Sequence, residues 1–376
     1  MKILLFANTD WYLYNFRLAL AQALQRRGDE VVLVSPEGAY AERLQQAGFR
    51  WVCFPLAQRG LNPLVEFLTI LRLVRLYRRE KPDLLQHFTV KCVLYGSLAA
   101  RLLGIRSVVN SLTGLGFVFT QGKGARRWLR AGIKAFYRLV LRRTWVIFQN
   151  PDDRNMFLQS HLVTPGRAAL IRGSGVDCSH FIPTPEPDGV PVVILPGRLL
   201  WDKGVGEFVA AARQLQADGL CARFALVGES DPQNPAAVPL VQLQAWEKTG
   251  VIEWWGWRED MAAVYAQAHI VCLPSFYREG VPKTLIEAAA CGRPIVTCDV
   301  AGCREIVRSG ENGLLVPARA IPALAAALKQ LIQEPGLRHA LGRRGRKIAE
   351  EEFSMELVIS QTLQVYHSAG EVEAER

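Results

Sequence analysis

The sequence predicts an α/β protein with two doubly wound, Rossmann-like domains that face a cleft. Three observations carry this prediction. The chain has 376 residues, half of them apolar, which is more than one core of ordinary size requires. Short apolar runs alternate with amphipathic stretches in both halves of the chain, a pattern typical of parallel sheets covered by helices. A proline-rich linker, residues 182–191, separates the two halves.

The elements expected in the first half alternate regularly between strand and helix, which predicts helices on both faces of a parallel sheet. Expected strands cover residues 2–7, 30–35, 51–54, 84–87 and 107–110, and expected helices cover residues 15–27 and 40–47. Together they form an N-terminal domain over residues 1–181.

The same rhythm returns after the linker. Expected strands cover residues 192–195, 223–227, 251–254, 270–273 and 294–297, and expected helices cover residues 206–218, 261–266 and 283–290. A second domain is therefore expected over residues 192–352. Residues 353–376 are expected to form a helix that packs back on the N-terminal domain. Ligands of such folds bind at the carboxyl ends of the strands, so the cleft is the expected site.

The sequence favours a cytoplasmic protein. It has no run of 18 or more residues that is both apolar and uncharged, so no transmembrane helix is expected. Its first residues are typical of a strand and lack the cleavage site of a signal peptide. The eight cysteines form no Cys-x-x-Cys pair, which favours buried thiols over a zinc site or disulfides.

Positive charge is concentrated in the first domain. Residues 1–150 hold 23 lysines and arginines against 8 acidic residues, whereas the remainder holds 22 against 27. Such a surface attracts anions: nucleic acid, phosphate groups or an acidic lipid surface. No recognised nucleic-acid motif accompanies the charge, so no nucleic-acid partner is expected. Neither domain has a Gly-x-Gly-x-x-Gly turn after its first strand, which argues against a dinucleotide oxidoreductase.

The strongest signal for a ligand site is a pair of glutamates eight residues apart, Glu279 and Glu287. The segment follows an apolar strand and opens a helix. Backbone amides near Gly280 can approach an anion at such a helix start, and Pro282 suits the first turn. Glu287 is placed to accept hydrogen bonds from ribose hydroxyls, and Glu279 to face a sugar. The alternative interpretation is a capped helix with two solvated carboxylates.

A second signal follows the first strand of the second domain. Arg198 and Lys203 are two cations beside a glycine turn: Gly197 precedes the arginine and Gly204 follows the lysine. A nucleotide diphosphate needs such groups, because arginine offers a forked donor and lysine a point charge. The leaving diphosphate gains charge during sugar transfer, so both cations would stabilise the transition state. The alternative is a surface turn with two solvated cations.

Taken together, these motifs and several others are similar to those of one enzyme family. The matched segments are 197–199, 203–204, 226–229, 255–257, 274–275, 279–287, 290–296, 302–305 and 312–316, with 172–177 and Phe181 resembling the end of the family's first domain. They resemble the retaining GT-B glycosyltransferases of family 4. The resemblance covers most of the chain.

The resemblance implies roles for the matched residues. Catalysis would involve Arg198, Lys203 and Glu279. The donor would be bound by Gly197, Ser275, Gly280, Val281, Pro282, Thr284, Glu287 and Trp257, with the base near Trp257 and Arg258. No cofactor and no metal are expected, since the sequence lacks an Asp-x-Asp motif and the two cations would replace the metal. The acceptor would attack the donor sugar from the same face on which the diphosphate leaves. A covalent intermediate on Glu279 is the weaker alternative.

Acceptor-binding candidates lie in the first domain, where this fold recognises acceptors. They are Asn15, Arg17, His87, Lys91, Thr113 and Gly114. Asn15 and Arg17 head the expected first helix, where phosphate can bind. The alternatives are an N-cap for Asn15, a solvated cation for Arg17 and a hydrogen-bonded strand-end histidine for His87. Thr113 stands where many family members carry an active-site histidine.

A contact with an anionic membrane surface is expected through residues 123–143, which hold eight basic and no acidic residues among interleaved aromatic and aliphatic ones. Residues 64–79 are a second candidate. The alternative is that these helices pack their apolar faces on the sheet and leave their arginines in water. A peripheral position on the inner face of the cell membrane follows from the first interpretation.

Five further segments, three in the first domain and two in the second, narrow the resemblance. Segments 15–17, 61–63, 114–116, 201–208 and 229–235 resemble the undecaprenyl-diphosphate-sugar alpha-N-acetylgalactosaminyltransferases of bacterial glycan assembly. This implies a UDP-N-acetylhexosamine donor, with GalNAc favoured, and a polyprenyl-diphosphate-sugar acceptor. Two alternatives stay open: a glycosyltransferase with a soluble or other polysaccharide acceptor, and a GT-B UDP-sugar 2-epimerase.

Overall fold

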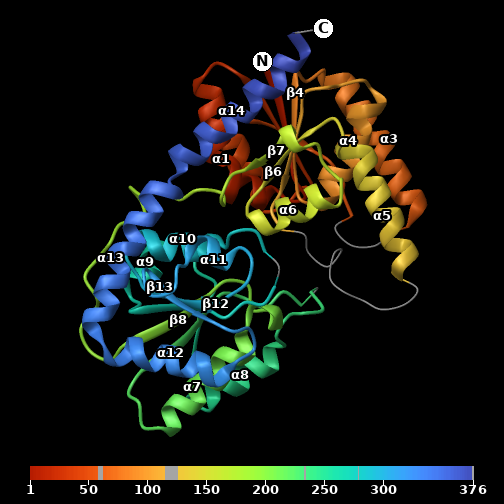
Figure 1. Cartoon of the computed structure of the whole chain (residues 1–376). Coiled ribbons are helices and arrows are strands. Elements are labelled where there is room, and N and C mark those ends of the chain that lie inside the picture. The colour runs from red at the N-terminus through yellow and green to blue at the C-terminus, as the bar shows by residue number, and fades with distance from the viewer. Residues whose placement is uncertain (58–61, 115–125, 233, 278, 375–376) are drawn as a thin grey trace. The chain divides into compact units, whose positions relative to one another are not determined.

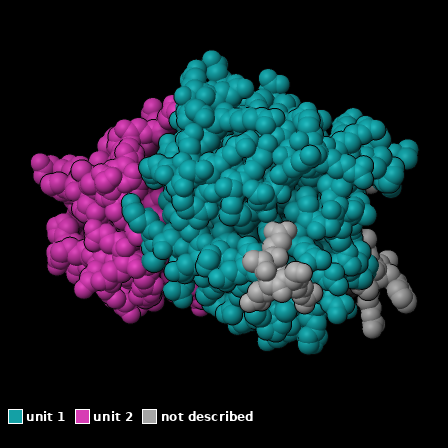
Figure 2. Space-filling model, turned by 90° about the horizontal axis from the view of Figure 1, so that it is seen from above, with its two compact units in different colours: residues 1–174, 356–376 teal, residues 175–355 magenta. Residues whose placement is uncertain are grey.

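Two parallel sheets, each covered by helices, make up the structure, a computed structural model that describes residues 1–57, 62–114, 126–232, 234–277 and 279–374. They belong to two units, coloured separately in Figure 2: unit 1 is Met1–Ser174 with Glu356–Arg376, and unit 2 is Gly175–Met355. The predicted α/β class with two doubly wound sheets is confirmed.

The sheet of unit 1 has seven strands in the order β3-β2-β1-β4-β5-β6-β7, and all neighbours are parallel. Its strands are β1 Lys2–Phe6, β2 Glu30–Ser35, β3 Arg50–Cys53, β4 Leu84–Phe88, β5 Val108–Leu112, β6 Trp145–Phe148 and β7 Ala168–Leu170. The strand order reverses between β1 and β4. In open α/β sheets a ligand crevice forms at such a reversal.

Helices cover both faces of this sheet (Figure 1). They are α1 Asp10–Arg26, α2 Ala41–Gln46, α3 Pro63–Glu80, α4 Val90–Leu102, α5 Arg126–Leu141, α6 Pro151–Gln159 and α14 Met355–Ala374. Side chains alternate across a strand, so Leu5 of β1 packs toward α1 and α14 whereas Leu4 packs toward α3 and α4. Val365 and Tyr366 bury one face of α14 in the core of unit 1.

Unit 2 repeats this plan with six parallel strands in the order β10-β9-β8-β11-β12-β13. The strands are β8 Val192–Pro196, β9 Arg223–Val227, β10 Glu253–Gly256, β11 Ile270–Leu273, β12 Ile295–Cys298 and β13 Gly313–Val316. The helices are α7 Val205–Ala217, α8 Leu240–Lys248, α9 Met261–Ala266, α10 Lys283–Ala290, α11 Cys303–Ile306, α12 Ile321–Gln333 and α13 Pro335–Glu352. Here the order reverses between β8 and β11.

The proline-rich segment 182–191 belongs to unit 2 and is held there by arginines. The Arg338 guanidinium binds the Glu186 carboxylate, with 2.7 Å between Nη2 and Oε2. Arg293, which is almost fully buried, donates from Nη2 to Thr184 Oγ1 at 2.7 Å. These hydrogen bonds to α13 and to the loop before β12 hold the segment within unit 2.

All eight cysteines are free thiols, and five of them are buried. Burial raises the pKa of both Cys92 and Cys303 to about 12, so these thiols stay protonated. Cys53 in unit 1 and Cys221 in unit 2 are exposed. No helix of the described ranges is both long and apolar enough to span a bilayer.

Candidate active site

The loops that follow β8 and β11 lie side by side, because the two strands are parallel neighbours and their carboxyl ends meet at one sheet edge. The backbone amides of Phe276 and Tyr277 donate to the Asp202 carbonyl oxygen at 3.1 and 3.2 Å. Gly204 has φ +78°, and a Cβ there would stand 2.2 Å from the Pro274 carbonyl oxygen. Only glycine fits this position without moving the second loop.

This junction brings three predicted site residues into direct contact. Lys203 Nζ lies 2.5 Å from both carboxylate oxygens of Glu279, and Ser275 Oγ lies 3.1 Å from Glu279 Oε1. The lysine and glutamate side chains are largely shielded from solvent. Lys203 is therefore a shielded cation whose partner is another candidate ligand-binding group, and an anionic ligand can take the carboxylate's place beside it.

Arg198 adds a second positive charge at the carboxyl end of β8. It is exposed and follows Gly197, whose φ of +136° turns the chain out of the strand. Burial raises the pKa of Tyr277, and the nearby positive charge of Arg198 opposes that rise. This electrostatic contact places Arg198 close to the loop that carries Glu279, as a diphosphate site requires.

Glu287 is a buried carboxylate on α10. The Tyr265 hydroxyl lies 3.1 Å from Glu287 Oε2 and 3.0 Å from the Thr284 carbonyl oxygen, and Lys283 Nζ lies 3.7 Å from Glu287 Oε1. Burial raises the pKa of Glu287, while Lys283 and Tyr265 oppose the rise. The alternative of two solvated carboxylates is thus wrong for Glu287. Sequence reasoning missed Tyr265, because its partner comes from another helix and no spacing signals the contact.

The segment between the two glutamates is tightly enclosed. Gly280, Val281 and Pro282 are all buried, and Pro282 occupies the N-cap position of α10. A Cβ on Gly302, which has φ +86°, would stand 1.7 Å from the Gly280 carbonyl oxygen. The loop before α11 therefore supports the loop before α10 through a backbone contact that only glycine permits.

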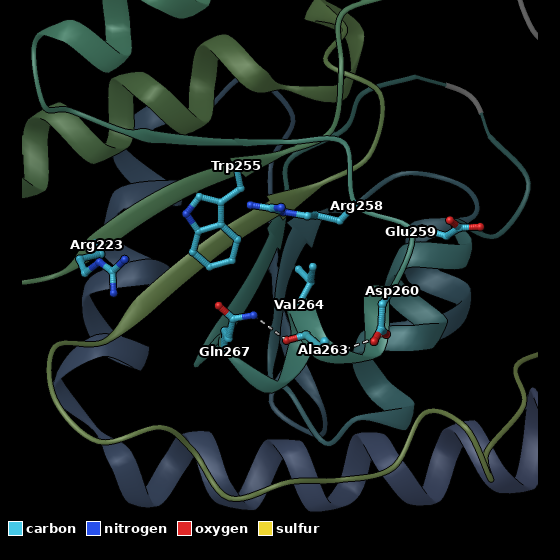
Figure 3. A pocket seen from close by; sticks show the side chains of 8 residues that line it. All are labelled: Arg223, Trp255, Arg258, Glu259, Asp260, Ala263, Val264 and Gln267. Atoms are coloured by element: carbon cyan, nitrogen blue, oxygen red, sulfur yellow. Dashed lines mark hydrogen bonds between the residues drawn. The ribbon is translucent and has the colours of Figure 1, made fainter.

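A separate cavity of about 430 Å³ lies between β10 and α9. Its lining residues are Arg223, Trp255, Arg258, Glu259, Asp260, Ala263, Val264 and Gln267. Figure 3 shows the Arg258 guanidinium extending toward the Trp255 ring. Arg258, beside the expected base site, thus reaches this cavity, whereas Arg198, Lys203, Glu279 and Glu287 do not line it. Trp257 is exposed. The cavity is distinct from the Lys203–Glu279 contact.

In unit 1, the expectation that Asn15 heads the first helix is wrong. Helix α1 begins at Asp10, and the Thr9 side chain caps it by accepting from the Tyr12 amide at 3.0 Å. Asn15 lies inside the helix and donates from Nδ2 to the Trp11 carbonyl oxygen at 3.0 Å. It is therefore neither an N-cap nor part of a phosphate site at the helix start.

Arg17 is buried rather than solvated. Its Nη2 donates to the Tyr12 hydroxyl at 2.8 Å, and its guanidinium carbon lies 4.4 Å from the centroid of the Phe88 ring. Contacts of a cation with aromatic faces compensate part of its desolvation. The alternative of a solvated cation is thus wrong for Arg17, and the residue lies inside α1 instead of at its start.

His87 is enclosed in the core of unit 1. One ring nitrogen lies 2.9 Å from Asn110 Oδ1 and the other 3.0 Å from the Tyr77 hydroxyl. Burial lowers the pKa of His87 to about 4, so the ring is neutral at physiological pH. The geometry supports the alternative of a hydrogen-bonded strand-end histidine. Because both ring nitrogens have partners, neither is left to bind the acceptor substrate.

The remaining acceptor candidates differ in their surroundings. Lys91 Nζ pairs with Glu66 at 2.8 Å, and both side chains are largely shielded. Thr113 and Gly114 follow β5 at the carboxyl edge of the sheet and are half-buried, with φ +134° at Gly114. Both residues directly follow β5, the strand beside β4. They therefore lie at the sheet edge where ligands of this fold bind.

We expect His87 to make the stability of the protein depend on pH. The unfolded ring titrates near 6.5 and the folded ring near 4, so protonation favours the unfolded chain as pH falls through this window. The free energy of unfolding should fall by on the order of 3 kcal/mol between these pH values. Urea denaturation at several pH values measures this loss.

In the His87→Gln variant, the dependence of unfolding free energy on pH should flatten in the same window. The exposed His367 supplies a matched control, and His367→Gln should leave the slope as it is. If the slope of the unfolding free energy against pH is unchanged in the His87 variant, His87 is not the source of the pH dependence.

Comparison with known proteins places both units in one class. Residues 2–150 match the family profile described as "Glycosyl transferase 4-like", and residues 190–334 match "Glycosyl transferases group 1". Among solved structures, Anabaena Alr3699/HepE in complex with UDP-glucose superposes with a TM-score of 0.79 at 19% identity, over 98% of this chain and 100% of that one. A glycosyltransferase from Rickettsia africae gives the same TM-score at 17% identity, over 98% of both chains.

A curated relative covers the chain from end to end. The N,N'-diacetylbacillosaminyl-diphospho-undecaprenol alpha-1,3-N-acetylgalactosaminyltransferase of Campylobacter jejuni is 27% identical over 97% of this chain and 98% of its own length. The UDP-Gal:alpha-D-GlcNAc-diphosphoundecaprenol alpha-1,3-galactosyltransferase of Escherichia coli is 24% identical over 74% of each chain.

The fold is that of the GT-B class, with two Rossmann-like units, and cationic and carboxylate groups lie at the carboxyl edge of the second sheet. The chain is a glycosyltransferase whose first half matches the 4-like profile and whose second half matches the group 1 profile. The prediction of a GT-B glycosyltransferase is thereby confirmed.

Proposed function

We propose that the enzyme transfers GalNAc from UDP-GalNAc to the sugar of a polyprenyl-diphosphate-linked acceptor, with retention of anomeric configuration. The observation that supports this most is the end-to-end similarity to the Campylobacter enzyme, which spans 97% of this chain and so includes both units. The relatives from Campylobacter and Escherichia are both named for an undecaprenyl-diphosphate-linked acceptor.

The donor site would work by exchange of anions. The diphosphate of the UDP-sugar would displace Glu279 from Lys203, and Arg198 would contact the same diphosphate. Glu279, released, would accept hydrogen bonds from the donor sugar. Glu287, held by Tyr265 and Lys283, would bind the ribose. Each group then performs a task that its position and charge suit.

During transfer, the bond between the anomeric carbon and the phosphate oxygen breaks, and a bond to the acceptor oxygen forms on the same face. The acceptor proton passes to the leaving phosphate. Arg198 and Lys203 face the oxygens on which negative charge grows, so they lower the barrier more than they strengthen binding of the ground state. We expect these cations to remove the need for a divalent metal.

The acceptor's lipid places the reaction at a membrane. We propose that the enzyme works as a peripheral protein on the inner, anionic face of the cell membrane, with its basic first unit toward the lipid. Lysines and arginines near such a surface are attracted by about 1 kcal/mol each.

A donor screen tests the proposal. Purified enzyme is incubated with UDP-, GDP- and ADP-sugars and undecaprenyl-diphosphate-sugar acceptors in detergent, and nucleotide release is followed. We expect release of UDP from UDP-GalNAc only when the lipid-linked acceptor is present, at a rate that EDTA does not change. UDP release with a soluble sugar acceptor would remove the lipid from the proposal. Conversion of the UDP-sugar without any acceptor would identify an epimerase.

A further inference from the structure

The first half of α3 exposes an apolar surface on unit 1. Leu64 is 74% exposed and Phe67 is 59% exposed. Val65, Leu68 and Leu71 are exposed as well, so large apolar side chains follow each other over the first turns of this helix. A contiguous apolar surface of this kind marks a site of contact with a partner or a membrane.

The rest of α3 anchors the helix. Leu73, Leu76 and Tyr77 are buried in the core of unit 1, and Glu80 at the C-terminal end pairs with Arg50 and other basic groups. The first turns contribute only Thr69 to the buried set of the helix. The exposed apolar side chains are therefore not needed to hold α3 in place.

Basic side chains continue the same face of α3. Leu64, Leu68 and Leu71 are followed at helical spacing by Arg75 and Arg78, and Arg72 lies beside them. All three arginines are exposed. The exposed face is thus apolar at its N-terminal end and cationic toward its C-terminal end.

Helix α5, the other membrane candidate, uses its apolar residues differently. Tyr137, Val140 and Leu141 are buried in the core, and the Tyr137 ring packs edge-on against Phe157. For this part of α5 the alternative interpretation holds: the apolar face packs inward. Residues 115–125 and the side chains of 126–131 lie outside the described residues. The exposed Lys134, Arg142 and Arg143 add positive charge.

We infer that α3 enters an anionic bilayer with its N-terminal end first, placing Leu64, Phe67 and Leu68 among the acyl chains and Arg72, Arg75 and Arg78 at the phosphate groups. The change from apolar to cationic along one helix face matches the change from acyl chains to phosphates across the membrane interface. A protein partner would need an acidic surface beside an apolar one, whereas an anionic bilayer offers both layers in this order. The inference rests on the proposed membrane-bound acceptor and names the element that reaches the lipid.

Vesicle sedimentation tests the inference with the full-length protein. We expect binding to phosphatidylcholine vesicles that contain about 30% phosphatidylglycerol, and at least about tenfold weaker binding for the double variant Leu64→Asn, Phe67→Asn. Val241→Asn, at an equally exposed apolar residue of unit 2, is the matched control and should bind as the wild type does. Arg72→Gln with Arg75→Gln should weaken binding to the anionic vesicles only.

Two further measurements distinguish a failure of the membrane inference from a failure of the proposed function. The Leu64/Phe67 variant should keep the wild-type rate of UDP release with a detergent-solubilised acceptor, because α3 belongs to unit 1 whereas the donor-site residues belong to unit 2. Absent transferase activity with α3-dependent vesicle binding would overturn the proposed function and leave the membrane contact standing. Unchanged vesicle binding in the variant would overturn the inference. So would a wild-type dimer that the variant converts to monomers in light scattering, since the surface would then join two copies of the chain.

Discussion

Replacing Lys203 with methionine should lower kcat by at least about a hundredfold, the scale on which loss of one preorganised charge contact slows a reaction. Methionine keeps the length of the side chain and removes its charge. In the free enzyme the lysine neutralises Glu279 at 2.5 Å, and in the reaction it would neutralise the leaving diphosphate. The variant therefore loses the positive charge that would stabilise the transition state. It also loses the charge that neutralises Glu279 in the free enzyme. Initial rates of UDP release measure the effect.

Lys347→Met is the matched control for this variant. Lys347 also pairs with a glutamate, Glu351 at 3.7 Å, but both side chains are exposed on α13. Exposed pairs contribute little to stability, so the control should keep the wild-type rate and melting temperature. Wild-type turnover in Lys203→Met would remove the lysine from the catalytic site, and the pair with Glu279 would then be structural.

Replacing Glu287 with glutamine should separate function from stability. We expect kcat/KM for the UDP-sugar to fall about tenfold to a hundredfold, mainly through KM, because charge-assisted hydrogen bonds to two ribose hydroxyls are lost. The melting temperature should stay the same or rise. Burial raises the pKa of Glu287, so the folded state disfavours the ionised form of this side chain, and glutamine removes that cost.

Both quantities are measured on one preparation, by steady-state kinetics and by thermal unfolding at neutral pH. Glu351→Gln, on an exposed residue, is the control and should change neither. A large drop in melting temperature with unchanged KM would assign Glu287 to the fold instead of the donor site. Tyr265→Phe removes the hydroxyl beside the carboxylate and should weaken donor binding in the same direction to a smaller extent.

Elements with a strong local pattern could be predicted from the sequence to the residue. The strands Arg223–Val227 and Ile270–Leu273 and the helices Met261–Ala266 and Lys283–Ala290 have the expected bounds. Each is a short apolar or amphipathic run with a clear stop, such as the Pro282 that precedes α10.

The start of α1 shows where local patterns fail. The aromatic residues at positions 11, 12 and 14 have only intermediate helix propensity, yet they are helical, since Thr9 caps the helix and Leu13 is buried in the core. Packing outweighs propensity here. The composition of residues 182–191 predicts a linker, but it gives no sign of Arg338 on α13 and Arg293 before β12, which hold the segment.

Long-range contacts could not be predicted from one sequence. The pairing of Lys203 with Glu279 joins residues 76 positions apart. The enclosure of His87 depends on Asn110 and Tyr77, which come from a neighbouring strand and a helix. In the sequence, residue type and position at or after a strand end place Lys203, Glu279 and His87 near an edge of a sheet. Only the packed structure shows that His87 is buried, whereas Lys203 and Glu279 can meet a ligand.

The distribution of the thiols makes the native chain suitable for fluorescence labelling. Cys53 and Cys221 are exposed, one on each unit, whereas buried thiols such as Cys272 and Cys303 have raised pKa values and react slowly with maleimides. With the half-buried Cys178 replaced by serine, a donor and an acceptor dye can thus be attached to the two exposed native cysteines. Energy transfer between the two dyes would report any change in the distance between the units when a UDP-sugar binds, in the same molecules whose turnover is measured.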